Sequence, residues 1–312
     1  MKTDAVFEGG GVKAIGFIGA VCRLEESGFT WENTAGTSAG AVVASLLAVG
    51  YRGIELKKIM MGMNFSKFAD KSSLKYFSII KHTYDIFSEK GIYCTKFIET
   101  YLSELYSAKG KKKFKDVSRY GKSRLKIIAS DVTQKRLLIL PDDLAFYGID
   151  PMEFEIAKAV IMSISIPIVF KPSVIKYGSK KESFIVDGGI LSNYPIWIFD
   201  VKGVPRWPTF GFKFEKNTDK NKPRKKRNDF IGYMMDIIEA VIDNYDETYI
   251  SDKDIVRTIS IPTNGVKSTD FGISRFKSRE LYELGYKSAD DFLKTWNFND
   301  YIRKYRGNVY GK

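Results

Sequence analysis

Histidine and cysteine are scarce in this chain. Its 312 residues contain one histidine, His82, and two cysteines, Cys22 and Cys94. Two cysteines cannot form a disulfide framework, and they do not have the spacing of metal ligands. A single histidine excludes a site built from several histidines and leaves His82 as the one candidate imidazole base. We therefore predict no metal site and no cofactor.

A long uncharged apolar stretch is also lacking. The longest ones, near residues 39–50 and 159–170, are shorter than the roughly 20 residues that a membrane-spanning helix needs. The first residues, MKTDAVFEGGG, hold too short an apolar stretch for a signal peptide. We therefore expect a soluble, cytoplasmic protein.

Basic residues are not spread evenly along the chain. The formal net charge is +13, from 50 Lys and Arg against 37 Asp and Glu. Eleven of the basic residues lie in two runs without acids, residues 109–115 (KGKKKFK) and 220–227 (KNKPRKKR). Without these eleven, 39 basic residues face 37 acidic ones, so the basic character is local. This argues against a chain that wraps nucleic acid, and we expect no nucleic-acid partner.

Strand and helix patterns alternate from the N-terminus. A short β-type run, residues 5–7, ends in three glycines, after which apolar residues recur near helical spacing as far as Gly28. The same order returns in residues 31–49, where a strand pattern, a turn of small residues and a helix pattern follow one another. Strands that alternate with helices predict an α/β architecture with a mainly parallel sheet.

The sequence contains no repeat, no low-complexity tract and no clear domain boundary. We expect a single domain over residues 1–312, with its core at about 4–214. A helical insertion is expected at about 54–120 and a C-terminal helical extension at about 229–312, from the helical spacing of their apolar residues.

The strongest chemical motif is GTSAG, residues 36–40. It joins a predicted strand to a predicted helix, and its glycines, Gly36 and Gly40, let the backbone turn sharply. Such a turn exposes its central serine, Ser38, at the mouth of the sheet and near a helix N-terminus. An isolated motif of this kind is by default only a loop serine, but the strand-turn-helix context favours a nucleophile.

Three glycines, Gly9, Gly10 and Gly11, precede the first helix pattern. Their N–H groups can closely approach a phosphate or the oxyanion of a tetrahedral intermediate. A dinucleotide fingerprint would need glycine at position 14, where the chain has Ala14, and no P-loop lysine motif follows. An oxyanion hole fits better because Ser38, a candidate nucleophile, follows in the sequence.

A nucleophilic serine needs a base. His82 lies in an aromatic stretch, YFSIIKHTYDIF, where a histidine is more often a packed or surface residue. Asp187 is better placed, because it ends the strand pattern of residues 184–186 and opens a turn through Gly188 and Gly189. From there a carboxylate can project toward the mouth of the sheet, where partial desolvation would raise its pKa. The alternative is that Asp187 only caps the turn.

Taken together, these motifs resemble the patatin-like phospholipases. The glycine turn of residues 9–13, which ends in Lys13, the serine turn and the Asp-Gly-Gly sequence occur in the order typical of that family. The resemblance covers roughly residues 4–214 and includes three further segments in that range: residues 129–133 (ASDVT), 163–167 (SISIP) and 191–195 (LSNYP). It extends more loosely to the C-terminal stretch from residues 269–271 (TDF).

This resemblance implies a three-layer patatin-like fold, with helices on both faces of the sheet, and a serine lipid acyl hydrolase with a Ser-Asp dyad. Carried over by position, Ser38 is the nucleophile and Asp187 the base. The amides around Gly10, Gly11 and Val12 form the oxyanion hole. No catalytic histidine is needed, in agreement with the histidine count. The implied substrates are phospholipids or related acyl lipids.

Several features and functions stay open. Residues 163–167 either line an acyl pocket or pack in the core, and residues 76–87 form either a lipid-facing lid or ordinary core. The basic runs are either solvated loops or a peripheral contact with an anionic membrane, worth about 1 kcal/mol for each basic side chain near the surface. The alternative functions are a carboxylesterase for small soluble esters, a catalytically vestigial protein that binds membrane or nucleic acid, and a nucleotide-binding protein.

Overall fold

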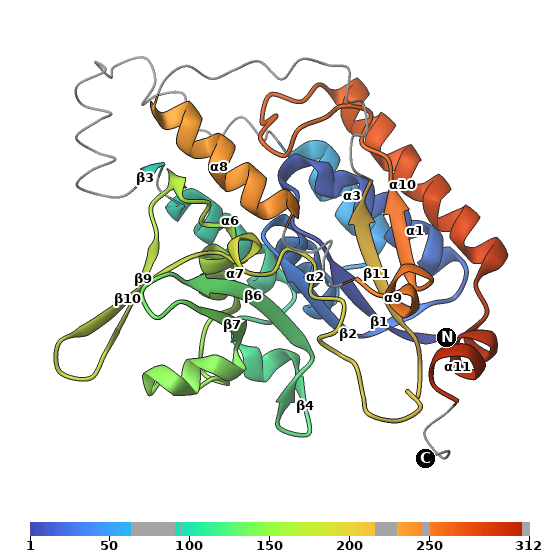
Figure 1. Cartoon of the computed structure of the whole chain (residues 1–312), viewed down its shortest axis with the longest axis horizontal. Helices are drawn as coiled ribbons and strands as arrows, with labels where there is room; N and C mark the ends of the chain where they lie inside the picture. Colours follow the sequence, from blue (N-terminus) through green and yellow to red (C-terminus); the bar gives the residue numbers. More distant parts are fainter. Residues whose placement is uncertain (64–90, 94, 216–229, 245–249, 308–312) are drawn as a thin grey trace.

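The computed structural model describes residues 1–63, 91–93, 95–215, 230–244 and 250–307. A central eight-stranded sheet crosses the molecule (Figure 1). Its strands lie in the order β12 (Thr258–Ile261), β11 (Thr209–Phe214), β1 (Lys2–Phe7), β2 (Thr30–Thr37), β6 (Leu125–Asp131), β10 (Lys181–Asp187) and β9 (Ser173–Tyr177), with β7 (Arg136–Leu140) paired to β6.

Most of the sheet is parallel. The pairs β12–β11, β11–β1, β1–β2 and β2–β6 are parallel, whereas β10, β9 and β7 add antiparallel pairs on the β6 side. Parallel neighbours need a crossover connection, and helices supply it here. The predicted α/β architecture with a mainly parallel central sheet is therefore confirmed.

Helices account for most of the remaining described residues. The longer ones are α1 (Ile15–Glu26), α2 (Ala39–Ala48), α3 (Gly53–Gly62), α6 (Lys96–Ala108), α7 (Ile156–Ile164), α8 (Phe230–Asn244) and α10 (Arg275–Thr295). The shorter ones are α9 (Asp252–Ile255), α11 (Phe298–Tyr305) and the 3-10 turns η1 (Gly11–Ala14), η3 (Phe114–Val117), η4 (Asp142–Tyr147) and η5 (Gly188–Ile190). Two small sheets pair β3 (Gly91–Tyr93) with β8 (Ile168–Phe170) and β4 (Ser118–Arg119) with β5 (Lys122–Ser123). No helix within these described ranges is long and apolar enough to cross a bilayer.

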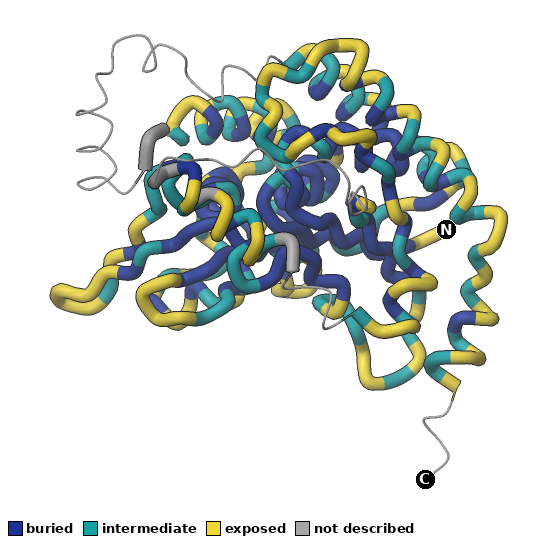
Figure 2. Tube along the Cα trace, turned by 45° about the horizontal axis from the view of Figure 1, so that its top comes forward, coloured by how far each residue is buried: buried dark blue, intermediate teal, exposed yellow. Residues whose placement is uncertain are grey.

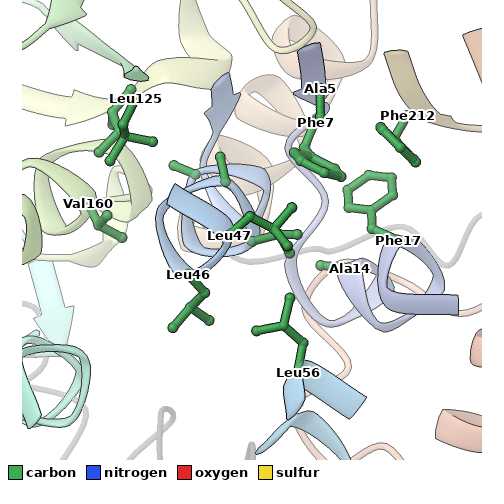
Figure 3. Packing of buried hydrophobic residues seen from close by; sticks show 14 of the residues in the cluster. Ala5, Phe7, Ala14, Phe17, Leu46, Leu47, Leu56, Leu125, Val160 and Phe212 are labelled. Carbon is green, nitrogen blue, oxygen red and sulfur yellow. The ribbon is translucent and has the colours of Figure 1, made fainter. Parts of the chain in front are cut away.

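The main hydrophobic core lies between one face of the sheet and the helices α1, α2 and α7. Buried residues fill the centre of the molecule, and exposed ones lie along its periphery (Figure 2). Alternate residues of β1 and β11 point into this core, where the rings of Phe7 and Phe212 stack with centroids 4.5 Å apart. Phe17 of α1 packs beside them, and Leu46 and Leu47 extend from α2 (Figure 3). This packing fixes α1 and α2 against the strands that precede them.

The opposite face of the sheet has a smaller core. Val6 and Ala35 pack there against Tyr194 and Ile196, from the segment that follows η5. Ile250, in the connection from β11 to β12 that also carries α8 and α9, packs against the same cluster. The chain after Asp187 is thereby held beneath β1 and β2, close to the ends of both strands.

The C-terminal part of the chain packs tightly against the N-terminal part. A Cβ atom on Gly285 of α10 would lie 1.8 Å from the carbonyl oxygen of Gly16 in α1. A Cβ atom on Gly19 would lie 1.9 Å from the carbonyl oxygen of Tyr282. Only glycine lets the two helices approach so closely. Residues 76–87, considered above as lid or core, and His82 within them lie outside the described residues.

Candidate active site

Ser38 occupies a strained turn between β2 and α2. Its φ of 52° and ψ of −126° place a non-glycine residue at positive φ, as a sharp strand-to-helix turn requires. A Cβ atom on Gly36 would lie 2.3 Å from the backbone of Gly40, and one on Gly40 would lie 2.4 Å from the carbonyl oxygen of Phe7. Both glycines flanking the serine are therefore required by close backbone approach.

The Ser38 hydroxyl donates a hydrogen bond to the carboxylate of Asp187. The distance from Ser38 Oγ to Asp187 Oδ2 is 2.6 Å, and the two residues are 8% and 1% exposed. The other carboxylate oxygen, Oδ1, accepts the N–H of Gly189 at 2.8 Å. Burial raises the pKa of Asp187 to about 6, although both hydrogen bonds act to lower it. Such a carboxylate is a stronger base than an exposed one.

Asp187 reaches Ser38 by a route that differs from the one that the sequence pattern suggests. Strand β10 runs antiparallel to β6, so Asp187 does not end a strand of the parallel set. On the side of β6 that faces away from β7, Asp187 pairs with Ala129, and Thr37 pairs with the preceding residue, Ile128. Strand β10 therefore ends where β2 also ends, and this brings the Asp187 carboxylate to Ser38.

The glycine turn between β1 and η1 lies beside Ser38. A Cβ atom on Gly9 would lie 3.2 Å from the Cβ of Ser38, and the Gly9 N–H donates to the carbonyl of Asn193 at 3.0 Å. Gly11 has a φ of +56°, and a Cβ atom there would lie 1.9 Å from the carbonyl oxygen of Ser268. Positive φ and this contact together require glycine at position 11.

The amides of the turn are not equally available. The Val12 N–H donates to the carbonyl of Ser268 at 3.1 Å, and the Lys13 N–H donates to the carbonyl of Gly10 at 3.2 Å. The Gly10 and Gly11 N–H groups form no hydrogen bond with another described residue. Of the predicted oxyanion donors Gly10, Gly11 and Val12, the Val12 N–H is thus already engaged within the protein.

Asn193 joins the two turns of the site, and the sequence analysis did not single it out. Its side-chain oxygen lies 2.2 Å from the position of a Cβ atom on Gly9 and 3.0 Å from that of one on Gly189. Its side-chain amide donates to the Gly9 carbonyl at 3.4 Å. The segment LSNYP carried this asparagine as part of the resemblance, and that was the signal available. Within the described ranges, no cluster of three or more His, Cys, Asp or Glu is placed to hold a metal ion.

Comparison with known proteins identifies the class to which this fold and site belong. The family model described as patatin-like phospholipase matches residues 5–200. The chain therefore belongs to the patatin-like phospholipase family, and the predicted family is confirmed. In broad terms, this family consists of lipid acyl hydrolases.

Relatives in sequence cover most of the chain. It is 35% identical over 298 residues to the uncharacterized protein YqhO of Bacillus subtilis (strain 168), across 96% of this chain and 100% of that protein. It is 25% identical over 226 residues to the probable lipid hydrolase 463L of Invertebrate iridescent virus 6, across 72% of this chain and 67% of that protein.

Two solved structures share the fold. VipD from Legionella pneumophila matches with a TM-score of 0.55 and 18% identity, over 94% of this chain and 67% of that one. The ExoU-SpcU complex from Pseudomonas aeruginosa matches with a TM-score of 0.52 and 16% identity, over 94% of this chain and 51% of the matched chain. Our chain thus spans about half the length of that chain. At such identities the likeness concerns the fold alone.

Proposed function

We propose that this protein hydrolyses fatty acyl esters of phospholipids or related lipids with Ser38 as nucleophile and Asp187 as base. The observation that carries the proposal is the 2.6 Å hydrogen bond between the Ser38 hydroxyl and the Asp187 carboxylate. Both groups are buried at the carboxyl edge of the parallel strands, on elements that the core holds firmly. A serine and a base within hydrogen-bond distance form the minimal unit of nucleophilic catalysis.

The reaction would proceed in two halves. Asp187 takes the hydroxyl proton as Ser38 Oγ attacks the ester carbonyl carbon, and a tetrahedral oxyanion forms. When the intermediate collapses, the proton passes from Asp187 to the leaving alcohol, and the fatty acyl group stays on Ser38. A water molecule then gives a proton to Asp187, attacks the acyl-enzyme and releases the fatty acid. Free Ser38 recovers its proton from Asp187.

The Gly10 and Gly11 amides are the proposed oxyanion donors. They lie in the turn that touches Ser38, and neither is engaged with another described residue. The bond from Val12 to Ser268 would hold the turn in place rather than contact the oxyanion. Donors that are fixed before the reaction stabilise the developing charge without having to reorganise.

We further propose that the protein is cytoplasmic and meets an anionic membrane through residues 220–227. The other basic run, residues 109–115, is a poorer candidate because three of its five lysines form ion pairs. These pairs join Lys109 to Glu55 at 2.7 Å, Lys113 to Glu153 at 2.9 Å and Lys115 to Glu153 at 2.7 Å. Residues 220–227 contain six basic side chains and no acid, and they lie outside the described residues.

Vesicle binding tests the membrane contact. Replacing the six basic residues of the run 220–227 with glutamine should weaken binding to phosphatidylglycerol-containing vesicles at low salt. Replacing the five lysines of the run 109–115 should have a smaller effect, because three of them are already ion-paired. Binding that ignores lipid charge and salt would contradict the contact.

Fatty-acid release from mixed phospholipid vesicles tests the proposed reaction. We expect release by the wild type in the presence of EDTA and its loss in Ser38→Ala, with folding checked by circular dichroism. Monomeric short-chain esters, assayed in parallel, separate a lipid hydrolase from a carboxylesterase. Release that survives in Ser38→Ala would contradict the nucleophile, and activity on short esters alone would assign the protein to the carboxylesterase alternative.

A further inference from the structure

A buried serine on α7 holds the backbone of Ser38. Ser163 is fully buried, and its Oγ accepts the Ser38 N–H at 2.9 Å. The same hydroxyl donates its proton to the carbonyl of Ile128 in β6 at 2.6 Å. A hydroxyl has one proton and two lone pairs, so the bond to Ile128 leaves a lone pair to accept the Ser38 N–H.

This contact answers a specific need of the turn. Ser38 precedes the first residue of α2 and sits at positive φ, so no strand or helix partner takes its N–H. A buried N–H without an acceptor is unfavourable, and a residue held at positive φ stays there only where its surroundings fix it. Ser163 supplies the acceptor and thereby favours the strained conformation that aims the hydroxyl of Ser38.

The same segment also holds Asp187. The Asp187 N–H donates to the backbone carbonyl of Ser165 at 2.9 Å. The Ser165 hydroxyl in turn donates to the carbonyl of Ile161 at 2.7 Å, and this bond fixes Ser165 on the last turn of α7. Both members of the dyad are therefore bonded through their backbone N–H groups to positions two residues apart.

We propose that the end of α7 is a clamp that positions the dyad, with Ser163 as the positioning residue for Ser38 and the Ser165 carbonyl as the one for Asp187. The clamp sets the 2.6 Å separation of the two reacting groups before a substrate arrives. It gives residues 163–167 a role other than acyl-pocket lining or plain core. This inference rests on the proposed function, because it concerns the reaction of Ser38.

The test compares Ser163→Ala with a matched control, Ser45→Ala. Ser45 is also fully buried, and its hydroxyl contacts Tyr106 Oη at 2.7 Å, so its removal likewise leaves a buried polar partner unpaired. Thermal unfolding should shift by similar amounts in the two variants. Only in Ser163→Ala should kcat fall, by about tenfold to a hundredfold, with KM unchanged. The rate at which a fluorophosphonate labels Ser38 should fall by the same factor.

Two further measurements keep the clamp falsifiable. If Ser163→Ala does not fold, Ser163→Cys replaces it, because a thiol fills similar space but accepts hydrogen bonds weakly. It should lose kcat with little loss of thermal stability. Amide exchange at Ser38, followed by NMR, is independent of activity and should be slow in the wild type and fast in Ser163→Ala.

The outcomes separate this inference from the proposed function. Labelling at the wild-type rate in Ser163→Ala, or an equal loss in Ser45→Ala, would overturn the clamp while leaving the nucleophile in place. A wild type that neither hydrolyses esters nor reacts at Ser38 would contradict the proposed function. In that case, an unchanged exchange rate at Ser38 in Ser163→Ala would overturn the clamp as well.

Discussion

Two buried carboxylates lie at opposite ends of the parallel strands, Asp187 at their carboxyl ends and Asp4 at their amino ends. The two differ in what surrounds them. Asp187 and Asp4 are 1% and 5% exposed, and burial raises the pKa of each to about 6. Asp187 accepts the hydroxyl of Ser38. Asp4, near the amino end of β1, accepts the backbone N–H and the side-chain amide of Asn33 at 3.0 and 2.7 Å, and Trp207 also donates to it.

This comparison separates a merely perturbed carboxylate from a candidate catalytic base. Burial alone shifts both pKa values, but only Asp187 faces a hydroxyl that can become a nucleophile. A cavity of about 640 Å³ even lies at the amino ends of the parallel strands, and its wall includes Phe29, Trp207 and Trp296. Neither a cavity nor a raised pKa therefore defines the candidate site, whereas the pairing of an acceptor with a strained serine does.

The largest expected effect comes from removing one carboxylate at a time. Asp187→Asn should lower kcat/KM for vesicle phospholipid by about four orders of magnitude, because the amide cannot take the proton from Ser38. Asp4→Asn should keep activity within about twofold, because its site contains no reacting group. Fatty-acid release by both purified variants measures this contrast. Comparable losses would show that burial, not pairing with Ser38, is what matters.

Two glycines with positive φ, one at each end of the parallel strands, provide the next contrast. Gly11→Ala should lower kcat by about a hundredfold to a thousandfold, because a Cβ atom would collide with Ser268 and displace the oxyanion donors. Gly28, before β2, also has positive φ (+84°), but nothing lies within 4 Å of a Cβ atom there. Gly28→Ala should therefore cost only about 1 kcal/mol of stability and leave kcat unchanged.

Measurements of kcat and of urea unfolding show whether Gly11→Ala impairs the reaction while Gly28→Ala lowers only the stability. An active Gly11→Ala enzyme would exclude the glycine turn as the oxyanion hole.

A smaller effect is expected in the pH dependence of the rate. As the proposed base, Asp187 can accept a proton only when it is ionised, and its pKa is about 6. We expect kcat/KM to fall by about tenfold for each pH unit below 6 and to level off above it. The Asp4→Asn variant should show the same profile. A wild-type profile that stays flat down to pH 4.5 would be inconsistent with Asp187 as the base.

The last expected effect is a pH-dependent change in the free energy of unfolding. A raised carboxyl pKa means that the folded state binds the proton more tightly than the unfolded state, whose pKa is about 3.8. Each group's contribution is therefore greatest at low pH and is lost as the pH rises from about 4 through 6. From the shift, this loss amounts to roughly 3 kcal/mol for each carboxylate.

Urea unfolding of the wild type, Asp4→Asn and Asp187→Asn between pH 4 and pH 8 checks this sign. Both variants should be less dependent on pH than the wild type, and by similar amounts. If only one of them changed the slope, the two carboxylates would differ in burial energetics as well as in chemistry.

Local chemistry explains what the sequence could predict. Ser38 stands out because a sharp turn into a helix requires small neighbours. Asp187 stands out because a serine needs a base, and His82 lies in an aromatic stretch of sequence that is typical of a packed or surface histidine. The direction of β10 could not be predicted, since an alternating pattern is the same whichever way a strand runs. The bond between Val12 and Ser268 was equally hidden, because it joins segments that only the folded sheet brings together.

The Ser268 carbonyl ties the glycine turn to a part of the chain that the ribosome makes after Ser38, Asp187 and the turn itself. A nascent chain that has emerged only as far as β11 contains Ser38, Asp187 and all three glycines of the turn. It still lacks the acceptor that holds Val12 in place. The turn is complete only after β12 and the segment beyond it have joined the sheet. A partly synthesised chain can therefore hold both proposed reacting groups while its glycine turn is still unfinished.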